Sequence, residues 1–235
     1  MQFTEKADYE EMSLAAADEI IKTVRDNSYA AIVLATGHSP LLAYRFFVRK
    51  AKDQKLDVSN ARFIKLDEWI GPDADSEATC ECFIRNEIIG PLHIAEDHYL
   101  HFSMNPDDCQ GECDRVEAAY LKLGKIDLVV LGIGMNGHLG LNEPAEILKC
   151  RANVVCIDAK TKHHEMLTHT AYEVSRGMTL GIADLFRGEE ILLLADGKDK
   201  SLEYLYNDKI TTKVPVSLLK LHPNCHCLIN RSCFS

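Results

Sequence analysis

Residues 126–132 read IDLVVLG, an apolar run interrupted by a single aspartate. A run without alternation of polar and apolar residues is typical of a strand buried on both faces of a parallel sheet. AAIVLA at 30–35 and ILLLA at 191–195 have the same character, and helical patterns lie between such runs. This order predicts an α/β fold with three layers, in which a mostly parallel sheet carries helices on both faces in a Rossmann-like arrangement.

The other elements are predicted from periodicity, caps and turn residues. Ser39 is expected to cap a helix that Pro40 opens. Helices are expected at 4–26, 40–52, 79–89, 106–123 and 200–206, a turn of helix near 183–185, and helix or loop at 161–171. Strands are expected at 62–67, 99–102, 154–157 and 227–229. Because no repeat, low-complexity tract or linker interrupts this pattern, residues 1–235 are expected to form a single domain.

The charge balance limits the partners of the protein. The 235 residues include 26 Lys and Arg against 36 Asp and Glu, which gives a formal net charge of −10. Nucleic acids and anionic membrane surfaces repel such a charge, so we expect neither as a partner. No stretch approaches 18 uncharged apolar residues, and the first residues, MQFTEKAD, do not resemble a signal peptide. A homo-oligomer is left open.

The nine cysteines do not follow the C-x-x-C spacing of a zinc site. Their number is odd, and we interpret them as reduced, buried thiols of a cytoplasmic protein without a bound metal. The stretch Cys225-His226-Cys227 leaves a metal-binding alternative open.

Three segments that directly follow predicted strands are candidates for chemistry, because ligands of open parallel sheets bind beyond the carboxyl ends of the strands. The first is ATGHSPL at 35–41, which joins a strand to a helix. Free backbone N–H groups and the helix dipole make Thr36, Gly37, His38 and Ser39 a candidate anion cradle. An ordinary tight turn would explain the same residues.

The second segment is LDEW at 66–69, at the end of a strand. Because side chains alternate along a strand, one of the two carboxylates, Asp67 or Glu68, can face the ligand crevice while the other turns away. The start of a solvated loop is the alternative interpretation.

The third segment is GIGMNGHLGLNEP at 132–144, which holds His138 and Glu143 in a glycine-rich loop. Glycine and asparagine suit a loop in which the backbone approaches a ligand closely. A histidine in such a loop, with a carboxylate near it, favours general acid–base chemistry over a structural role. A carboxylate, a His–Glu pair and an anion cradle at one edge of one sheet suit proton transfer on a small phosphorylated molecule.

These segments resemble the glucosamine-6-phosphate deaminase/isomerase family, and the resemblance covers essentially the whole chain. It is carried by LATGHSPL at 34–41, KLDEW at 65–69, GMNGHLGLNEP at 134–144 and GKDK at 197–200. Within the family the chain is most similar to the galactosamine-6-phosphate isomerase branch. This similarity is carried by Trp69, Asn136, HEML at 164–167 and SRGMTLG at 175–181.

The resemblance implies a role for each motif residue. Asp67 takes the position of the base that moves a proton between C2 and C1 of the sugar. His138 takes the position of the group that opens the pyranose ring, and Glu143 that of the carboxylate that supports this histidine. The loop at 36–39 and Lys200 take phosphate-binding positions.

The chain departs from the glucosamine-6-phosphate enzymes at two positions. Asn136 stands where they have an aspartate two residues before the histidine. A neutral amide cannot stabilise an imidazolium by charge, so the pairing with Glu143 has to suffice. The arginine that those enzymes use on the phosphate falls near Glu165 here, and Arg176 is the expected replacement.

The implied activity is aldose–ketose isomerisation with deamination of a 2-amino-2-deoxyhexose 6-phosphate, without a metal or another cofactor. The resemblance favours galactosamine 6-phosphate, converted to tagatose 6-phosphate and ammonia, over glucosamine 6-phosphate.

Three other classes of protein stay open. Asp67 and Glu68 argue against a 6-phosphogluconolactonase-like hydrolase, and an acidic chain that begins with the sheet domain argues against a sugar-phosphate sensor of a transcription regulator. A fold-mate that has lost catalysis is the third, because of Asn136.

Overall fold

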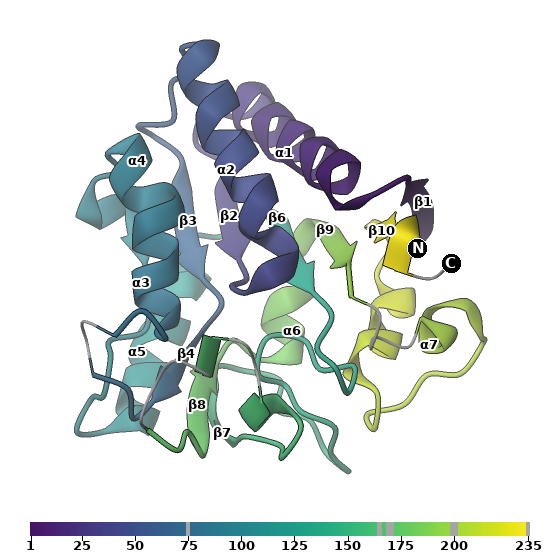
Figure 1. Ribbon diagram of the computed structural model, residues 1–235. Helices are drawn as coiled ribbons and strands as arrows, with labels where there is room; N and C mark the ends of the chain where they lie inside the picture. Colours follow the sequence, from purple (N-terminus) through teal and green to yellow (C-terminus); the bar gives the residue numbers. More distant parts are fainter. Residues whose placement is uncertain (74–75, 164–165, 168–171, 198–201, 234–235) are drawn as a thin grey trace.

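A seven-stranded sheet forms the centre of the protein (Figure 1). In the computed structural model, which describes residues 1–73, 76–163, 166–167, 172–197 and 202–233, the seven strands pair in parallel. The apolar runs quoted above form three neighbouring central strands, as predicted. The spatial order is β1 (Gln2–Lys6), β10 (Cys225–Asn230), β9 (Gly188–Ala195), β6 (Ile126–Gly132), β2 (Ala31–Leu34), β3 (Arg62–Lys65) and β5 (Tyr99–Leu100).

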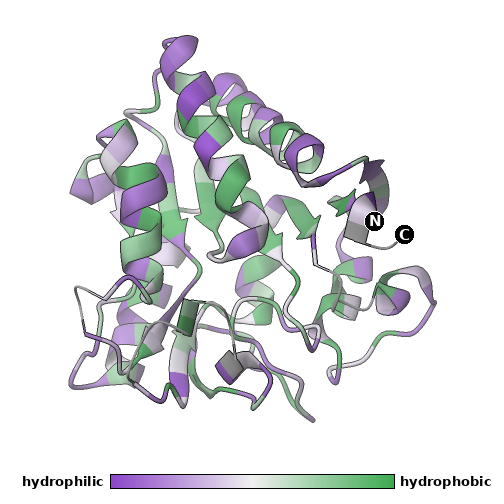
Figure 2. Cartoon of the chain, in the orientation of Figure 1, coloured by the Kyte–Doolittle hydropathy of each residue, from purple (hydrophilic) through white to green (hydrophobic). Residues whose placement is uncertain are grey.

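Helices pack on both faces of this sheet, which confirms the three-layer α/β prediction. Strand β2 shows why both layers form, because Ile32 and Leu34 belong to one buried cluster and Ala31 and Val33 to the other. Figure 2 shows the same division, with hydrophobic residues on the sheet and hydrophilic residues on the outer turns of the helices. The first layer consists of α1 (Tyr9–Asp26), α2 (His38–Asp53), α3 (Cys80–Ile84), the π-helical turn Arg85–Ile89 and α4 (Gly90–Leu92). The second consists of α5 (Cys109–Lys122), α6 (Ile182–Leu185), α7 (Glu203–Tyr206) and the 3-10 helix Pro215–Leu221.

A second, antiparallel sheet of three strands lies beyond the main one, in the order β4 (Asp67–Ile70), β8 (Arg176–Thr179) and β7 (Asn153–Cys156). The prediction of one strand over 62–67 is therefore wrong. At Leu66 the backbone N–H still bonds to Leu34 of the main sheet, whereas its carbonyl accepts from Leu180 beside the second sheet. The chain changes sheets at this residue, and Asp67 opens β4.

Two boundaries near the start of the chain also differ from the prediction. Residues 2–6 form β1, an edge strand that pairs with β10, so the helix begins at Tyr9, with Asp8 as its cap, and not at residue 4. Helix α2 begins at His38, and its cap is Gly37, whose φ of +101° suits a residue without a side chain. The prediction of Ser39 as the cap is wrong, because Ser39 already lies in the first turn.

The remaining predicted elements form with shifted ends. The helix predicted at 106–123 begins at Cys109 because Asp108 caps it, and the strand predicted at 99–102 is limited to Tyr99–Leu100. A 3-10 turn, Thr161–His163, stands at the start of the 161–171 segment, most of which lies outside the described residues, as do residues 200 and 201 of the helix predicted at 200–206.

Two findings concern membrane-spanning helices and metal sites. In the part of the chain that the structure describes, no helix has the length and apolar character that crossing a membrane requires. Among the same residues, no group of three His, Cys, Asp or Glu side chains is arranged to hold a metal ion. In particular, Cys225 and Cys227 pack in the core, whereas the ring of His226 hydrogen-bonds to Thr4, so these three side chains do not converge.

Candidate active site

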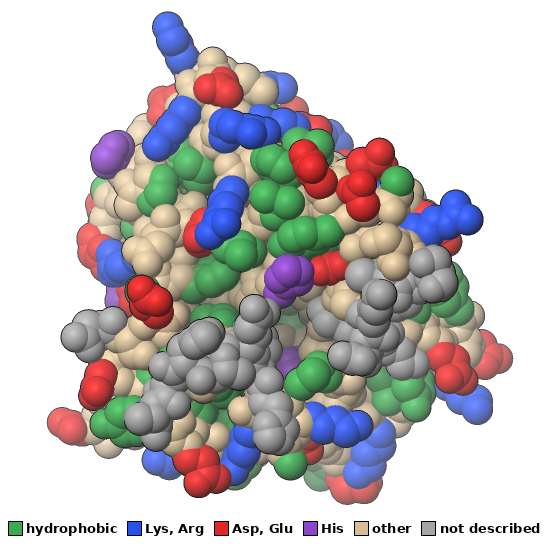
Figure 3. Space-filling model, in the orientation of Figure 1, with side chains coloured by type: hydrophobic (Ala, Val, Ile, Leu, Met, Phe, Trp, Pro, Cys, Tyr) green, Lys and Arg blue, Asp and Glu red, His purple; other side chains and the backbone are tan. Residues whose placement is uncertain are grey.

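The segments that follow β2, β3, β6 and β9 meet beyond the carboxyl edge of the main sheet. A Cβ atom built on Gly132, at the end of β6, would lie 3.7 Å from Cβ of Ser39 in the first turn of α2, which follows β2. His38, the first residue of α2, contacts Asp196, which directly follows β9, with 3.1 Å between Nε2 and Oδ2. Figure 3 shows histidine and acidic side chains together near the middle of the corresponding face. The structure thus brings the predicted segments together.

Asp67 lies at the start of β4 and is almost fully buried, with 5% of its surface exposed. Its Oδ1 atom has no hydrogen-bond partner among the described residues. Burial and, to a smaller extent, the neighbouring charge of Glu68 raise the pKa of Asp67 to about 7, and His138 opposes the shift. A carboxyl group with this pKa can accept and return a proton near neutral pH.

Glu68 turns away from Asp67, as alternation predicts, but it does not reach solvent. Its carboxylate accepts from Lys65 Nζ at 2.6 Å and from the backbone N–H groups of Cys80 and Glu81 at 2.9 and 2.8 Å. Lys65 also donates to Glu81 at 2.6 Å and is fully buried. The interpretation as a solvated loop start is wrong, because a buried ion cluster fixes β4 to the first turn of α3.

His138 lies at the centre of a network of oxygen atoms. Its Nδ1 atom lies 2.9 Å from Oδ1 of Asn136 and 3.3 Å from Oε2 of Glu143. A carboxylate and an amide oxygen only accept hydrogen bonds, so this arrangement places the proton on Nδ1 and leaves Nε2 as the basic nitrogen. The neutral ring can then accept a proton from a ligand at Nε2.

The loop that carries His138 depends on glycine at several positions. A Cβ atom on Gly134 would lie 2.2 Å from Nε2 of His138, so a side chain there would displace the imidazole. Gly137 and Gly140 have φ of +82° and +58°, which favours glycine. The turn is closed by bonds from Gly134 N–H to the His138 carbonyl and from Gly137 N–H to the Gly134 carbonyl.

Asn136 connects the histidine with the glutamate. Its amide nitrogen donates to Oε2 of Glu143 at 2.8 Å, while its oxygen faces Nδ1 of His138. Burial alone would raise the pKa of Glu143, but the hydrogen bond and charge of His138, with the bond from Asn136, hold the pKa below its usual value. An aspartate at 136 would place a second carboxylate against Glu143, whereas the asparagine links the two residues without this repulsion.

The candidate anion cradle, residues 36–39, lies at the amino end of α2. Gly37 caps this helix of 16 residues, and Thr36 donates to Sγ of Cys80 at 3.3 Å, which ties the loop to α3. His38 stacks on the ring of Tyr9 with 4.7 Å between ring centres. Asp196 is buried behind His38 and accepts from Asn230 at 2.7 Å. Cys80 and Asp196 were not recognised in the sequence, because nothing in their neighbourhoods distinguishes them from core and loop residues.

The two predicted phosphate-binding cations have different outcomes. Lys200 lies outside the described residues. Arg176 is exposed on β8, where it pairs with Ile70, and it lines a hollow with Asn105 and Val154. Asp67 pairs with Thr179, three residues farther along β8, a separation of about 10 Å at 3.3 Å per residue. The hollow that Arg176 lines includes none of residues 36–39, and its role at the phosphate stays a prediction.

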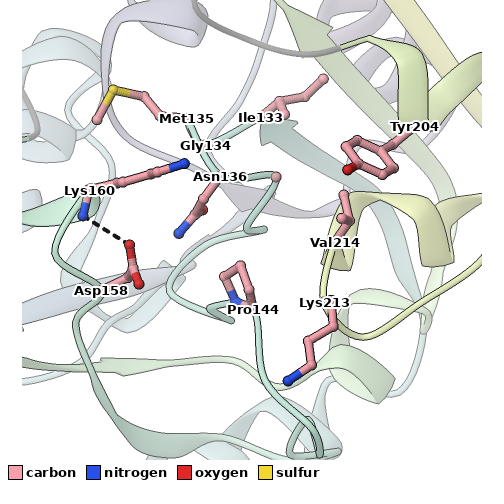
Figure 4. A pocket seen from close by; sticks show the side chains of 11 residues that line it. Ile133, Gly134, Met135, Asn136, Pro144, Asp158, Lys160, Tyr204, Lys213 and Val214 are labelled. Atoms are coloured by element: carbon pink, nitrogen blue, oxygen red, sulfur yellow. Dashed lines mark hydrogen bonds between the residues drawn. The ribbon is translucent and has the colours of Figure 1, made fainter.

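A cavity of about 520 Å³ adjoins the loop of His138 (Figure 4). Lys160 directs its ammonium group toward Gly134 and Asn136, and Tyr204 stands on the opposite side. Lys213, also in the wall, is paired with Glu146. The lining consists of residues 133–137, Pro144, Asp158, Lys160, Tyr204, Lys213 and Val214. A polar ligand in this cavity would contact the backbone of the loop that carries His138.

Known proteins are similar to this chain along nearly its whole length. Residues 5–224 match the family described as "Glucosamine-6-phosphate isomerases/6-phosphogluconolactonase". A relative from Escherichia coli (strain K12), named "Putative deaminase AgaI", is 40% identical over 224 residues, which cover 94% of this chain and 89% of that protein. A glucosamine-6-phosphate deaminase from Thermoanaerobacter pseudethanolicus is 33% identical over 231 residues, which cover 97% of this chain and 91% of the relative.

Solved structures show the same similarity. A monomeric glucosamine-6-phosphate deaminase superimposes with a TM-score of 0.92 at 29% identity, over 100% of this chain and 99% of that one. A 6-phosphogluconolactonase from Trypanosoma cruzi superimposes with a TM-score of 0.76 at 20% identity, over 99% and 95% of the two chains. The second similarity concerns the fold alone.

Proposed function

The chain belongs to the glucosamine-6-phosphate isomerase/6-phosphogluconolactonase family, and from this premise we propose that it converts galactosamine 6-phosphate to tagatose 6-phosphate and ammonia. The coarser statement, an amino-sugar-phosphate deaminase/isomerase, is supported by the deaminases among its relatives. The observation that carries the proposal is the buried Asp67, with its pKa of about 7, beside the His138–Glu143 pair. Trp69 and Asn136, which resemble the galactosamine-6-phosphate branch, support the choice of substrate.

The first step is the opening of the sugar ring. The substrate is mostly a cyclic hemiacetal, and its C2 proton becomes acidic only after an aldehyde forms at C1. Nε2 of His138 takes the proton from O1 and delivers a proton to O5, so that the C1–O5 bond breaks. The imidazolium formed in between is stabilised by Glu143, whose Oε2 lies 3.3 Å from Nδ1.

The second step is proton transfer between two carbons. Asp67 removes the proton from C2 and leaves an enol that still carries the amine. Protonation at C1 then gives an imine at C2, and water adds to the imine and releases ammonia, which leaves a 2-keto sugar phosphate. Each positioned acid or base contributes on the order of 10²- to 10⁴-fold to the rate. The phosphate, remote from the reacting carbons, supplies binding energy that holds C2 against Asp67.

The substrate is tested by measuring ammonia release from galactosamine 6-phosphate and glucosamine 6-phosphate in parallel assays. We expect the higher kcat/KM for galactosamine 6-phosphate, with tagatose 6-phosphate as the product. Unphosphorylated galactosamine is the control, and it should react poorly. A higher kcat/KM for glucosamine 6-phosphate would reject the galacto assignment and leave the coarser function in place.

The hydrolase alternative is tested with 6-phosphogluconolactone. This ester has no amine to release, and its hydrolysis requires no proton transfer from carbon. Lactone hydrolysis without ammonia release from either amino sugar would reject the deaminase proposal.

The phosphate-binding role of Lys200 is tested with Lys200→Ala, with Arg176→Ala as the matched control. Loss of one charged hydrogen bond costs roughly 1.5–3 kcal/mol, so KM for the 6-phosphate should rise about tenfold or more in Lys200→Ala. Arg176→Ala should leave KM unchanged, because the hollow that Arg176 lines includes none of residues 36–39. The reverse pattern of KM values would identify Arg176 as the phosphate-binding cation.

A further inference from the structure

The segment 158–161, which follows β7, packs against the back of the His138–Glu143 pair. The backbone N–H of Asp158 donates to Oε1 of Glu143 at 3.3 Å. Oγ1 of Thr161 lies 3.1 Å from Nδ1 of His138, and the same hydroxyl helps to lower the pKa of Glu143. Thr161 is 1% exposed. Its hydroxyl is thus a buried contact of His138 near Glu143, from a part of the chain that no motif singled out.

The three oxygen atoms around Nδ1 differ in what they can do. The amide oxygen of Asn136 and the carboxylate of Glu143 only accept hydrogen bonds, whereas the hydroxyl of Thr161 both accepts and donates. The direct distance of 3.3 Å between Nδ1 and Glu143 is longer than the 2.7–2.9 Å typical of a charged hydrogen bond. Thr161 can accept from Nδ1–H and donate to Glu143, and so complete this contact.

We propose that Thr161 is a positioning residue for ring opening, whose hydroxyl accepts from Nδ1 of His138 and helps Glu143 to stabilise the imidazolium. This role rests on the proposed function. Thr161 does not touch the reacting atoms; it acts through His138, whose Nε2 takes the proton from O1.

The test compares Thr161→Val, which keeps the shape and removes the hydroxyl, with Thr161→Ser, which keeps the hydroxyl and removes a methyl group. Thr161→Val should lower kcat for ammonia release from the cyclic substrate by about ten- to hundredfold, the effect of losing a hydrogen bond to a charged group. Thr161→Ser should retain most of the activity. Thr23→Val is the control, because the Thr23 hydroxyl donates to the backbone carbonyl of Glu19 within α1, and this variant should behave as the wild type.

A second readout needs no substrate. Nitrogen NMR of ¹⁵N-histidine-labelled protein, with His138→Gln to assign the signal, reports which ring nitrogen of His138 carries the proton. We expect the Nδ1–H form in all three proteins, because Asn136 and Glu143 accept from Nδ1 in each of them, and a shifted Nδ1 signal in Thr161→Val, where the contact with the hydroxyl is lost. Equal losses in the Ser and Val variants, or an unchanged His138 signal in Thr161→Val, would overturn the role of Thr161. If the wild type released no ammonia from either amino sugar, the proposed function would fail, while the NMR comparison would still decide what Thr161 does.

Discussion

Replacement of Asp67 by Asn is expected to lower kcat for ammonia release by at least about 100-fold, while substrate binding stays largely intact. The amide has nearly the same shape as the carboxylic acid but cannot accept the proton from C2. The measurement is a steady-state ammonia assay with the cyclic substrate, together with a binding titration with substrate. Near-wild-type ammonia production by Asp67→Asn would reject Asp67 as the base.

The same variant separates the activity of Asp67 from its effect on stability. In the wild type, kcat/KM should rise with pH through about 7, because the base must be ionised and burial raises the pKa of Asp67 to about 7. The pKa of Asp67 is higher in the folded protein than in the unfolded chain. The neutral carboxyl group of Asp67 therefore contributes its full stabilisation below about pH 4, and this contribution to the free energy of unfolding is lost as the pH rises to about 7.

An asparagine is neutral at every pH, so Asp67→Asn does not pay the free-energy cost of ionising a buried carboxyl group. Asp67→Asn should therefore have a higher Tm than the wild type at pH 8, by several degrees, and the difference should shrink toward pH 5. Thermal unfolding of both proteins at the two pH values is the measurement. A difference in Tm that does not change with pH would contradict the raised pKa of Asp67.

Replacement of His138 by Gln is expected to lower turnover of the cyclic substrate by roughly 10²- to 10⁴-fold, the range for loss of a positioned acid–base group. Glutamine can hydrogen-bond within the network of Asn136 and Glu143 but cannot take the proton from O1. The effect should be smaller in the reverse direction, where open-chain keto sugar phosphate and ammonium enter and the enolisation step precedes ring closure.

The two steps are followed separately by forward ammonia release and by incorporation of solvent deuterium at C1 of the keto sugar. For His138→Gln we expect a large loss of the first rate and a smaller loss of the second. Asp67→Asn is the matched control, because it should abolish both. Equal losses for cyclic and open-chain substrates in His138→Gln would give His138 a role other than ring opening.

The central sheet and the candidate acid–base residues Asp67 and His138 could be predicted from local sequence. A strand that is buried on both faces must be apolar at consecutive positions, and this requirement marks the runs that became β2, β6 and β9. The glycine-rich stretch at 132–144 predicts the loop of His138, because the loop requires glycine: a side chain at Gly134 would collide with His138. The segments that carry Asp67 and His138 follow β3 and β6, and a parallel sheet brings such segments to one edge.

Tertiary structure alone decided how these groups are held. The lysine and glutamates of the Lys65–Glu68–Glu81 cluster look like surface residues in the sequence, because only their mutual pairing permits full burial. The antiparallel register of β8 with β4 pairs Arg176 with Ile70, at a hollow that includes none of residues 36–39. Thr161 reaches His138 across 23 positions of sequence. Hydrophobic pattern reports the burial of one segment, whereas contacts of this kind depend on which distant segment packs against it, and that is determined only when the chain is folded.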